Sequence, residues 1–330
     1  MKRRLIWGVL IVCLTFAFLF SFQDLGRAAS DYPNKAIQII MPFNPGGGAD
    51  VAARLFATYL SKKWKVPVNV LNKAGGAGII GTRDVMEAAP DGYTMLGEGH
   101  ASSSLLAAFE ENLPFQLENR TFICRVTLDP LIYLVRPDAP WKSLKELADF
   151  TLKSPKVLRW GNGGLGGVSA AAGIQFFMLN KIPIANVNRV VFQGEAPVIA
   201  ALAGSHIDFA GQQTSASMGM VLGKKIRPLA VVSEKRFASL PDVPTVGEVG
   251  YPQLDVTGWH GISGPPGLPE AISTKWAKAL EEASTDPAFL DMANKAYKVV
   301  SYLGPKDFRE FVMKEYTKYV AMGKEIGIRK

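Results

Sequence analysis

The chain has 330 residues, of which 48% are hydrophobic and 20% are charged, and its formal net charge at pH 7 is +8. This composition excludes a disordered protein, and the length suits two domains better than one. Glycine and proline are frequent but follow no Gly-X-Y period, so a collagen-like chain is excluded. With two cysteines in the whole chain, a disulfide framework cannot hold the fold together.

Residues 1–30 have the pattern of a secretory signal peptide. Basic residues at positions 2–4 precede an apolar stretch over 5–22, and small residues follow as far as Ser30. Cleavage after Ala28 and cleavage after Ser30 both place a small residue at the −3 position. An uncleaved membrane anchor is the alternative, because the apolar stretch is long for a signal peptide and marginal for a span. We therefore expect a periplasmic protein, with tethering to the membrane as the open alternative.

Strands and helices alternate along the rest of the chain, which predicts an α/β fold with largely parallel sheets. In the first part, short apolar strands are expected at 36–41, 66–71 and 93–96, with helices at 50–64 and 82–89. Further on, strands are expected at 157–160, 190–192, 207–210 and 226–232, with helices at 169–179 and 194–203. The stretch from residue 269 is helical, and Pro305 restarts a last helix that runs to about Met322.

Two strand-rich crossings, near 122–135 and 228–235, enclose a self-contained α/β block. Their positions predict two lobes, of which the first is discontinuous. The first lobe would comprise residues 31–131 and 234–330, and the second residues 132–233.

The chain lacks the patterns of common catalytic and nucleic-acid-binding sites. Its three histidines have no partner at metal-ligand spacing, and neither a nucleophile elbow nor a P-loop motif is present. Basic residues are scattered and form no stripe, so no nucleic-acid partner is expected. We expect no metal, no cofactor and no catalysis; an enzyme would need His100 or Glu195 as its base.

Two glycine-rich loops, at 42–50 and 161–169, each follow a strand and precede a helix. Such a loop exposes backbone N–H groups at a helix N-terminus, which suits a carboxylate, and glycine lets the ligand approach closely. One loop per lobe would hold a small acid from both sides, at the carboxyl ends of the strands. The alternative is that both loops are tight turns without a ligand.

Four groups of motifs carry a family resemblance. They are Tyr32-Pro33 with PFNPGG at 42–47; NKAGGAGIIG at 72–81 with PDGYT at 90–94; GEAP at 194–197 with Gly204 and Asp208; and LPDVPT at 240–245 with GYP at 250–252 and Trp259. In this order and spacing the chain resembles the substrate-binding receptors of tripartite tricarboxylate transporters, the Bug-type periplasmic proteins. The resemblance covers nearly the whole chain after residue 30.

The resemblance implies a two-lobed periplasmic-binding-protein fold of type II. Each lobe would be a mixed, mostly parallel sheet flanked by helices, with the ligand cleft between the lobes. The implied function is that of an extracytoplasmic receptor, usually monomeric, that captures a small organic acid and delivers it to the membrane subunits of a transporter. A receptor that feeds a signalling partner instead is the alternative.

Ligand-binding residues are expected in five places along the chain. By resemblance, the two glycine-rich loops and the GEAP turn contribute Phe43, Asn44, Gly46, Gly47, Gly48, Asp50, Gly163, Gly164, Gly166, Val168, Ser169, Gly194 and Glu195. The loop after the strand at 93–96 is a plausible pocket wall and adds His100, Ala101 and Ser102, although His100 is equally compatible with a surface position. Gln212 and Gln213 follow a buried strand, where their amides would need partners and a ligand would be one.

Two carboxylates in this set have other interpretations. Asp50 and Arg54 stand at i and i+4, which favours an ion pair within one helix. Glu195 stands where relatives usually have a small residue, and a carboxylate facing an acidic ligand would repel it. We expect Glu195 to point away from the cleft; otherwise the ligand carries a hydrogen-bond donor or a cation.

Overall fold

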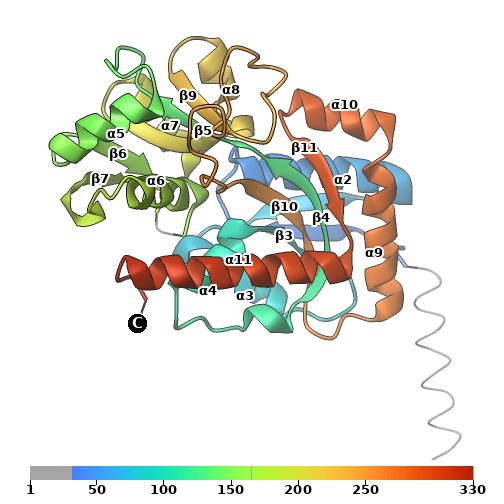
Figure 1. Ribbon diagram of the computed structural model, residues 1–330. Helices are drawn as coiled ribbons and strands as arrows, with labels where there is room; N and C mark the ends of the chain where they lie inside the picture. Colours follow the sequence, from blue (N-terminus) through green and yellow to red (C-terminus); the bar gives the residue numbers. More distant parts are fainter. Residues whose placement is uncertain (1–31, 165, 330) are drawn as a thin grey trace, which may run out of the picture.

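The computed structural model describes residues 32–164 and 166–329, which Figure 1 shows coloured along the sequence from blue to red. The predicted signal peptide, residues 1–30, lies outside the described residues. Within the described ranges, no helix combines the length and apolar character that a membrane span requires.

The first lobe is built on a six-stranded sheet. In spatial order its strands are β11 (Val299–Leu303), β4 (Thr121–Asp129), β10 (Gly258–Gly264), β3 (Thr94–Gly99), β1 (Ile37–Met41) and β2 (Val68–Asn72). Its helices are α2 (Gly48–Trp64), α3 (Ile79–Met86), α4 (Ser104–Phe109), α9 (Glu270–Ala283), α10 (Pro287–Lys295) and α11 (Pro305–Glu325). Short 3₁₀ turns lie at η1 (Gly76–Gly78), η2 (His100–Ser102) and η3 (Leu117–Asn119).

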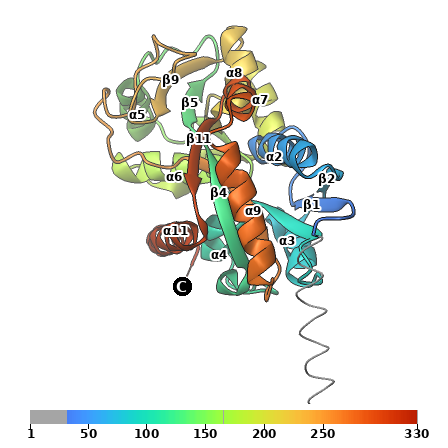
Figure 2. The same ribbon diagram turned by 90° about the vertical axis from the view of Figure 1, so that its right-hand side faces the viewer.

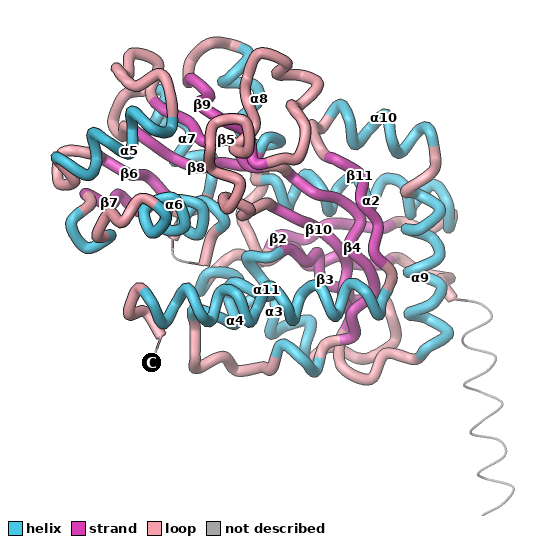
Figure 3. The backbone as a smooth tube through the Cα atoms, in the orientation of Figure 1, coloured by secondary structure: helices cyan, strands magenta, loops and turns pink. Residues whose placement is uncertain are grey.

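The second lobe is built on a five-stranded sheet, and in both lobes helices pack outside the strands (Figure 3). In spatial order the strands are β7 (Asn188–Val191), β6 (Arg159–Asn162), β8 (Phe209–Gln213), β5 (Leu131–Val135) and β9 (Arg227–Val232). The helices are α5 (Leu144–Lys153), α6 (Val168–Leu179), α7 (Glu195–Ala203) and α8 (Thr214–Leu222), and η4 (Ile184–Asn186) is a short turn. The predicted two-lobed α/β architecture is confirmed.

Both sheets are mixed, and antiparallel pairs are at least as frequent as parallel ones. The strands joined through helices, such as β1 with β2 and β6 with β7, pair in parallel. Antiparallel pairs join β10 to β3 and β4, β11 to β4, and β5 to β8 and β9. Parallel pairing is therefore less dominant than the alternation of strands and helices led us to expect.

The chain crosses from the first sheet to the second along β4 and β5, which are separated only by Pro130 (Figure 2). It returns through the segment 233–257. This segment packs largely on the second lobe: Thr245 bridges to Val231 of β9, and the Tyr251 hydroxyl donates to Asn180 at the end of α6, 2.9 Å away. Residues 234–256, expected in the first lobe, therefore pack mainly against the second.

A buried ion pair stands at the crossing. Asp129, the last residue of β4, and Lys298, just before β11, are both fully buried, and Nζ lies 2.7 Å from Oδ2. The other oxygen, Oδ1, accepts hydrogen bonds from Thr214 Oγ1 at 2.7 Å and from the Ser215 amide at 3.1 Å, so Asp129 also holds the start of α8. Burial opposes ionisation, but Lys298 and His260 together outweigh it and hold the pKa of Asp129 well below its usual range.

We expect Lys298→Met to lower the free energy of unfolding by about 3–5 kcal/mol, because it leaves a buried carboxylate without its partner. The matched control is Lys295→Met, which removes an exposed i, i+4 pair with Asp291 and should cost less than about 0.5 kcal/mol. Urea unfolding of both variants at neutral pH measures the difference. Equal effects of the two substitutions would contradict a structural role for the buried pair.

The depressed pKa of Asp129 also fixes the direction of a pH effect. An aspartate whose folded pKa lies below its unfolded value stabilises the fold above about pH 4 and loses that contribution as the pH falls further.

Candidate functional site

A cavity of about 210 Å³ lies between the lobes. It is lined by the turns that precede α2, α3, α6 and α7 and by the loop that follows β3. The first two of these helices belong to the first lobe and the last two to the second. The cavity therefore lies where the sequence analysis expects the ligand cleft, at the ends of strands that lead into helices.

The four helices that begin at this cavity share one kind of start. Each has a glycine as its N-cap, at positions 47, 78, 167 and 194, and none has a side-chain hydrogen bond at that cap. Outside the cavity lining, α11 starts in the same way at Gly304, whereas α5 is capped by Ser143 and α10 by Asp286, which accept hydrogen bonds from backbone amides. Helix starts without side-chain caps carry backbone N–H groups and a positive dipole end, both of which attract an anion.

Most of the site residues predicted from the sequence line this cavity. Those that do are Phe43, Asn44, Gly47, Gly48, Asp50, His100, Ala101, Gly163, Gly166, Val168, Ser169, Gly194, Glu195 and Gln213. The structure thus brings the two glycine-rich loops, the GEAP turn and the end of β8 together around one space.

Four predicted residues lie outside the lining. Gly46 and Gly164 have positive φ angles of 89° and 101° and shape their turns. Ser102 exchanges hydrogen bonds with the backbone of Gly99. Gln212 precedes Gln213 in β8, and successive side chains of a strand point to opposite faces.

The cavity is also lined by residues that no sequence pattern assigned to the site: 74–78, Gln193, Pro197 and His260. The segment 74–78 follows β2 and precedes α3, so the same strand–glycine–helix signal would have identified it. His260 lies within the buried strand β10 and is preceded by no turn, which leaves no local signal for it.

Asp50 is committed to its own lobe. Its carboxylate accepts hydrogen bonds from Arg54 Nε at 2.9 Å, from Asn72 Nδ2 at 2.8 Å and from the Gly46 amide at 3.1 Å. Burial opposes ionisation, but these donors outweigh it and lower the pKa of Asp50. The expected ion pair with Arg54 is confirmed, and it holds the glycine turn against the start of α2.

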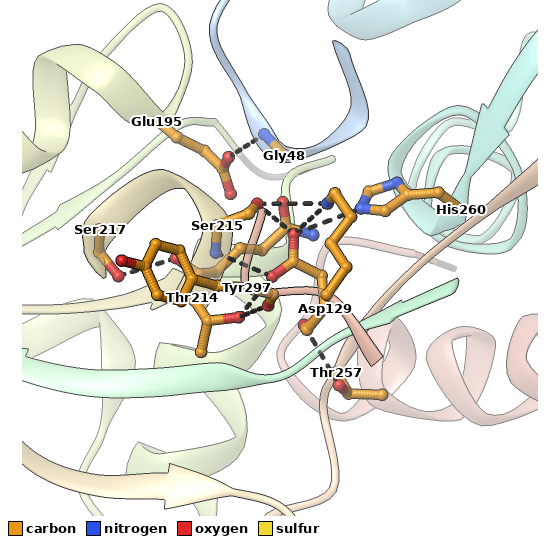
Figure 4. Close-up of polar contacts among 11 residues, drawn as sticks. Gly48, Asp129, Glu195, Thr214, Ser215, Ser217, Thr257, His260 and Tyr297 are labelled. Carbon is orange, nitrogen blue, oxygen red and sulfur yellow. Dashed lines mark hydrogen bonds and ion pairs between the residues drawn. The ribbon is translucent and has the colours of Figure 1, made fainter. Parts of the chain in front are cut away.

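Glu195 points into the cavity, so the expectation that it points away is wrong. Its Oε2 accepts a hydrogen bond of 3.1 Å from the amide of Gly48, which joins the first turn of α7 to the first turn of α2 across the cleft (Figure 4). With its amide oriented to satisfy both groups, Gln213 donates to the two carboxylate oxygens at 3.1 and 3.2 Å. An acidic side chain is stabilised at a helix N-terminus, which explains its orientation.

The surroundings of Glu195 make its charge costly. Burial raises the pKa of its carboxyl to about 7, since the hydrogen bond from Gly48 only partly offsets it and the charge of Asp129 adds to the shift. The positive charge of Lys298 lowers the pKa of Glu195 and so reduces the shift.

Two buried imidazoles complete the site. His100 is 3% exposed and has no hydrogen-bond partner among the described residues. His260 is 2% exposed, and its Nε2 lies 3.6 Å from Oδ2 of Asp129, beyond normal hydrogen-bond distance. Burial lowers the pKa of His100 to about 3 and, together with the nearby Lys298, that of His260 to about 4. Both rings are neutral at physiological pH and each offers one donor and one acceptor.

Comparison with known proteins identifies the family of this architecture. The family profile described as "Tripartite tricarboxylate transporter family receptor" matches residues 52–328. Protein BugT of Bordetella pertussis is 28% identical over 306 residues, which cover 92% of each chain. A UPF0065 protein encoded in the TAR-I ttuE-ttuC′ intergenic region of Agrobacterium vitis is 30% identical over 270 residues, 81% of this chain and 76% of the relative.

Solved structures give the same result. The periplasmic binding protein BugD superposes with a TM-score of 0.82 at 28% identity, covering 91% of this chain and all of BugD. MatC from Rhodopseudomonas palustris, solved with bound malate, has a TM-score of 0.80 at 25% identity and covers 88% of this chain and 99% of its own. With its two lobes, its glycine-lined cleft and these matches, the chain belongs to the tripartite tricarboxylate transporter receptor family of periplasmic solute-binding proteins.

Proposed function

We propose that this protein captures a small organic acid between its lobes and delivers it to the membrane subunits of a tripartite tricarboxylate-type transporter. The observation that carries the proposal is the convergence of four helix starts without side-chain caps, two from each lobe, on one cavity. Backbone N–H groups at these starts would hold a carboxylate, directly or through water. The malate bound to MatC is consistent with a ligand of this class.

Domain closure would couple capture to delivery. A ligand that contacts α2 and α3 on one side and α6 and α7 on the other stabilises the closed arrangement by its differential affinity for that state. In this proposal the moving bodies are residues 31–131 with the C-terminal part of the chain, and residues 132–233 with the segment 234–256 that packs on them. The short link at Pro130, between β4 and β5, is the natural hinge.

The remaining properties follow from the same proposal. Residues 1–30 direct export to the periplasm, the receptor acts as a monomer, and the ligand leaves chemically unchanged. Incubation with a bound acid and chromatography of the released ligand would reveal any turnover.

A ligand screen tests the proposed function. Protein purified after export to the periplasm is melted in the presence of three- to six-carbon mono-, di- and tricarboxylates. A ligand present at about 100 times its dissociation constant should stabilise the fold by about 2.7 kcal/mol, which raises the melting temperature visibly. Absence of a shift with every acid, together with absence of an acid released from the denatured protein, would contradict the proposal.

A pair of glycine substitutions tests the approach of the lobes. A Cβ atom at Gly48 would collide with the side-chain amide of Gln213 and lie 2.7 Å from Oδ2 of Asp129, whereas a Cβ atom at Gly219 would meet nothing within 4 Å. We expect Gly48→Ala to weaken ligand binding by about tenfold or more, because overpacking costs roughly 1–3 kcal/mol.

The control is Gly219→Ala, at an exposed position of α8 outside the cavity lining, where the added Cβ atom meets nothing within 4 Å. Titration calorimetry with the acid found in the screen should give an affinity within about twofold of the native protein. Equal losses in both variants would show that the effect is not the collision at Gly48.

A further inference from the structure

The carboxylate of Glu195 differs from the other acidic groups near the cavity because no cation neutralises it. Asp50 is paired with Arg54, and Asp129 with Lys298. Among the described residues, the cavity lining contains neither lysine nor arginine, and Glu195 takes part in no ion pair. Its partners are the Gly48 amide and the Gln213 side chain, which are neutral.

The cavity therefore presents groups of both signs. The helix starts carry partial positive charge from their N–H groups, which suits an anionic group of the ligand. Glu195, in the first turn of α7, adds a negative charge that would repel a second anionic group and pair with a cation. A plain dicarboxylate is attracted by the N–H groups and repelled by Glu195.

Two further groups on the lining require a polar ligand. The rings of His100 and His260 are more than nine-tenths buried and line the cavity. Among the residues that the structure describes, His100 has no hydrogen-bond partner and Nδ1 of His260 has none, while Nε2 of His260 lies 3.6 Å from Asp129. Buried polar groups are nearly always paired in native proteins, so the ligand or water that it carries would complete them. Because both rings are neutral, they can bind either a donor or an acceptor and add no charge that would cancel Glu195.

We propose, building on the function above, that Glu195 makes this receptor selective for acids that also carry a protonated amine. The carboxylate of such a zwitterion binds the N–H groups of the glycine turns, and its ammonium binds Glu195, replacing the neutral partners that the carboxylate has in this structure. Glu195 is thus the specificity-determining residue of the site.

Ligands that share one skeleton provide the test. L-Aspartate, L-malate and succinate differ only at the second carbon, which carries an ammonium, a hydroxyl or a hydrogen; L-alanine, L-lactate and propionate form the matching three-carbon set. Titration calorimetry with the exported protein should rank the amine first in the set that fits the cavity. Its advantage over the unsubstituted acid should be about 10- to 100-fold, the range of a hydrogen bond to a charged group.

The substitution Glu195→Gln separates charge from shape. It should weaken binding of the amine by about tenfold or more and leave the unsubstituted acid bound equally well or more tightly. Glu310→Gln, which removes the same charge from an exposed position on α11, is the control and should change neither affinity. Melting of the ligand-free variants checks the fold, and Glu195→Ser serves as a second variant if the glutamine destabilises it.

The pH dependence gives an independent signature. The charged and titratable groups around Glu195 are Asp129, Lys298 and Asp50, which are paired, and the two neutral histidines. Because the pKa of Glu195 is about 7, its ionised fraction rises between about pH 5.5 and about pH 8, while the ligand amine stays protonated. Affinity for the amine should rise about tenfold over this range in the native protein and stay flat in the glutamine variant.

Three results would overturn the inference. They are an amine that binds no more tightly than the unsubstituted acid, a glutamine variant that changes all members of a set equally, and an affinity for the amine that falls as the pH rises. If no acid of either kind binds, the proposed function itself fails and the inference fails with it. If unsubstituted acids bind and amines do not, the function stands and only the role of Glu195 is refuted.

Discussion

Asp129 is the group on which the arrangement of the two lobes depends. It ends the last strand of the first sheet before the chain crosses over, and its two oxygens hold Lys298 from the first lobe and the start of α8 from the second. Removing a charge of this kind from water is costly, and only a close and complete set of partners offsets the cost. The Asp129 carboxylate also contributes to the raised pKa of Glu195 and lies close to Gly48. One charged group therefore acts both at the proposed hinge and at the cavity.

The cavity is built largely from backbone. The helices α2, α3, α6 and α7 begin at the cleft with glycine, where α5 and α10 carry a side-chain cap; α11 also begins with a glycine. A frame of N–H groups recognises any carboxylate with little regard to the rest of the molecule. Selectivity then falls to the few side chains on the walls, and among these Glu195 is the only one with an unneutralised charge in the described part of the lining.

The features that a short stretch of sequence determines could be predicted, and those that depend on distant segments could not. The glycine turns at 42–50 and 161–169 are local signals, and both line the cavity. The orientation of Glu195 depends on the amide of Gly48, which lies 147 positions away in the chain, so no local pattern contains it. His260 lies in a strand whose place in the middle of the sheet is set by antiparallel pairing with β3 and β4, which lie far from it along the chain.

The last helix adds a mechanical consequence. Near its start, Phe308 and Val312 of α11 pack against Phe122 and Trp259 of the first lobe. Near its end, Tyr319 and Met322 join a hydrophobic cluster that contains Leu105 of α4 together with residues of the second lobe. One helix therefore contacts both lobes at a point distant along the chain from the β4–β5 link. In the proposed closure, this second connection would restrict the directions in which the lobes can rotate relative to each other.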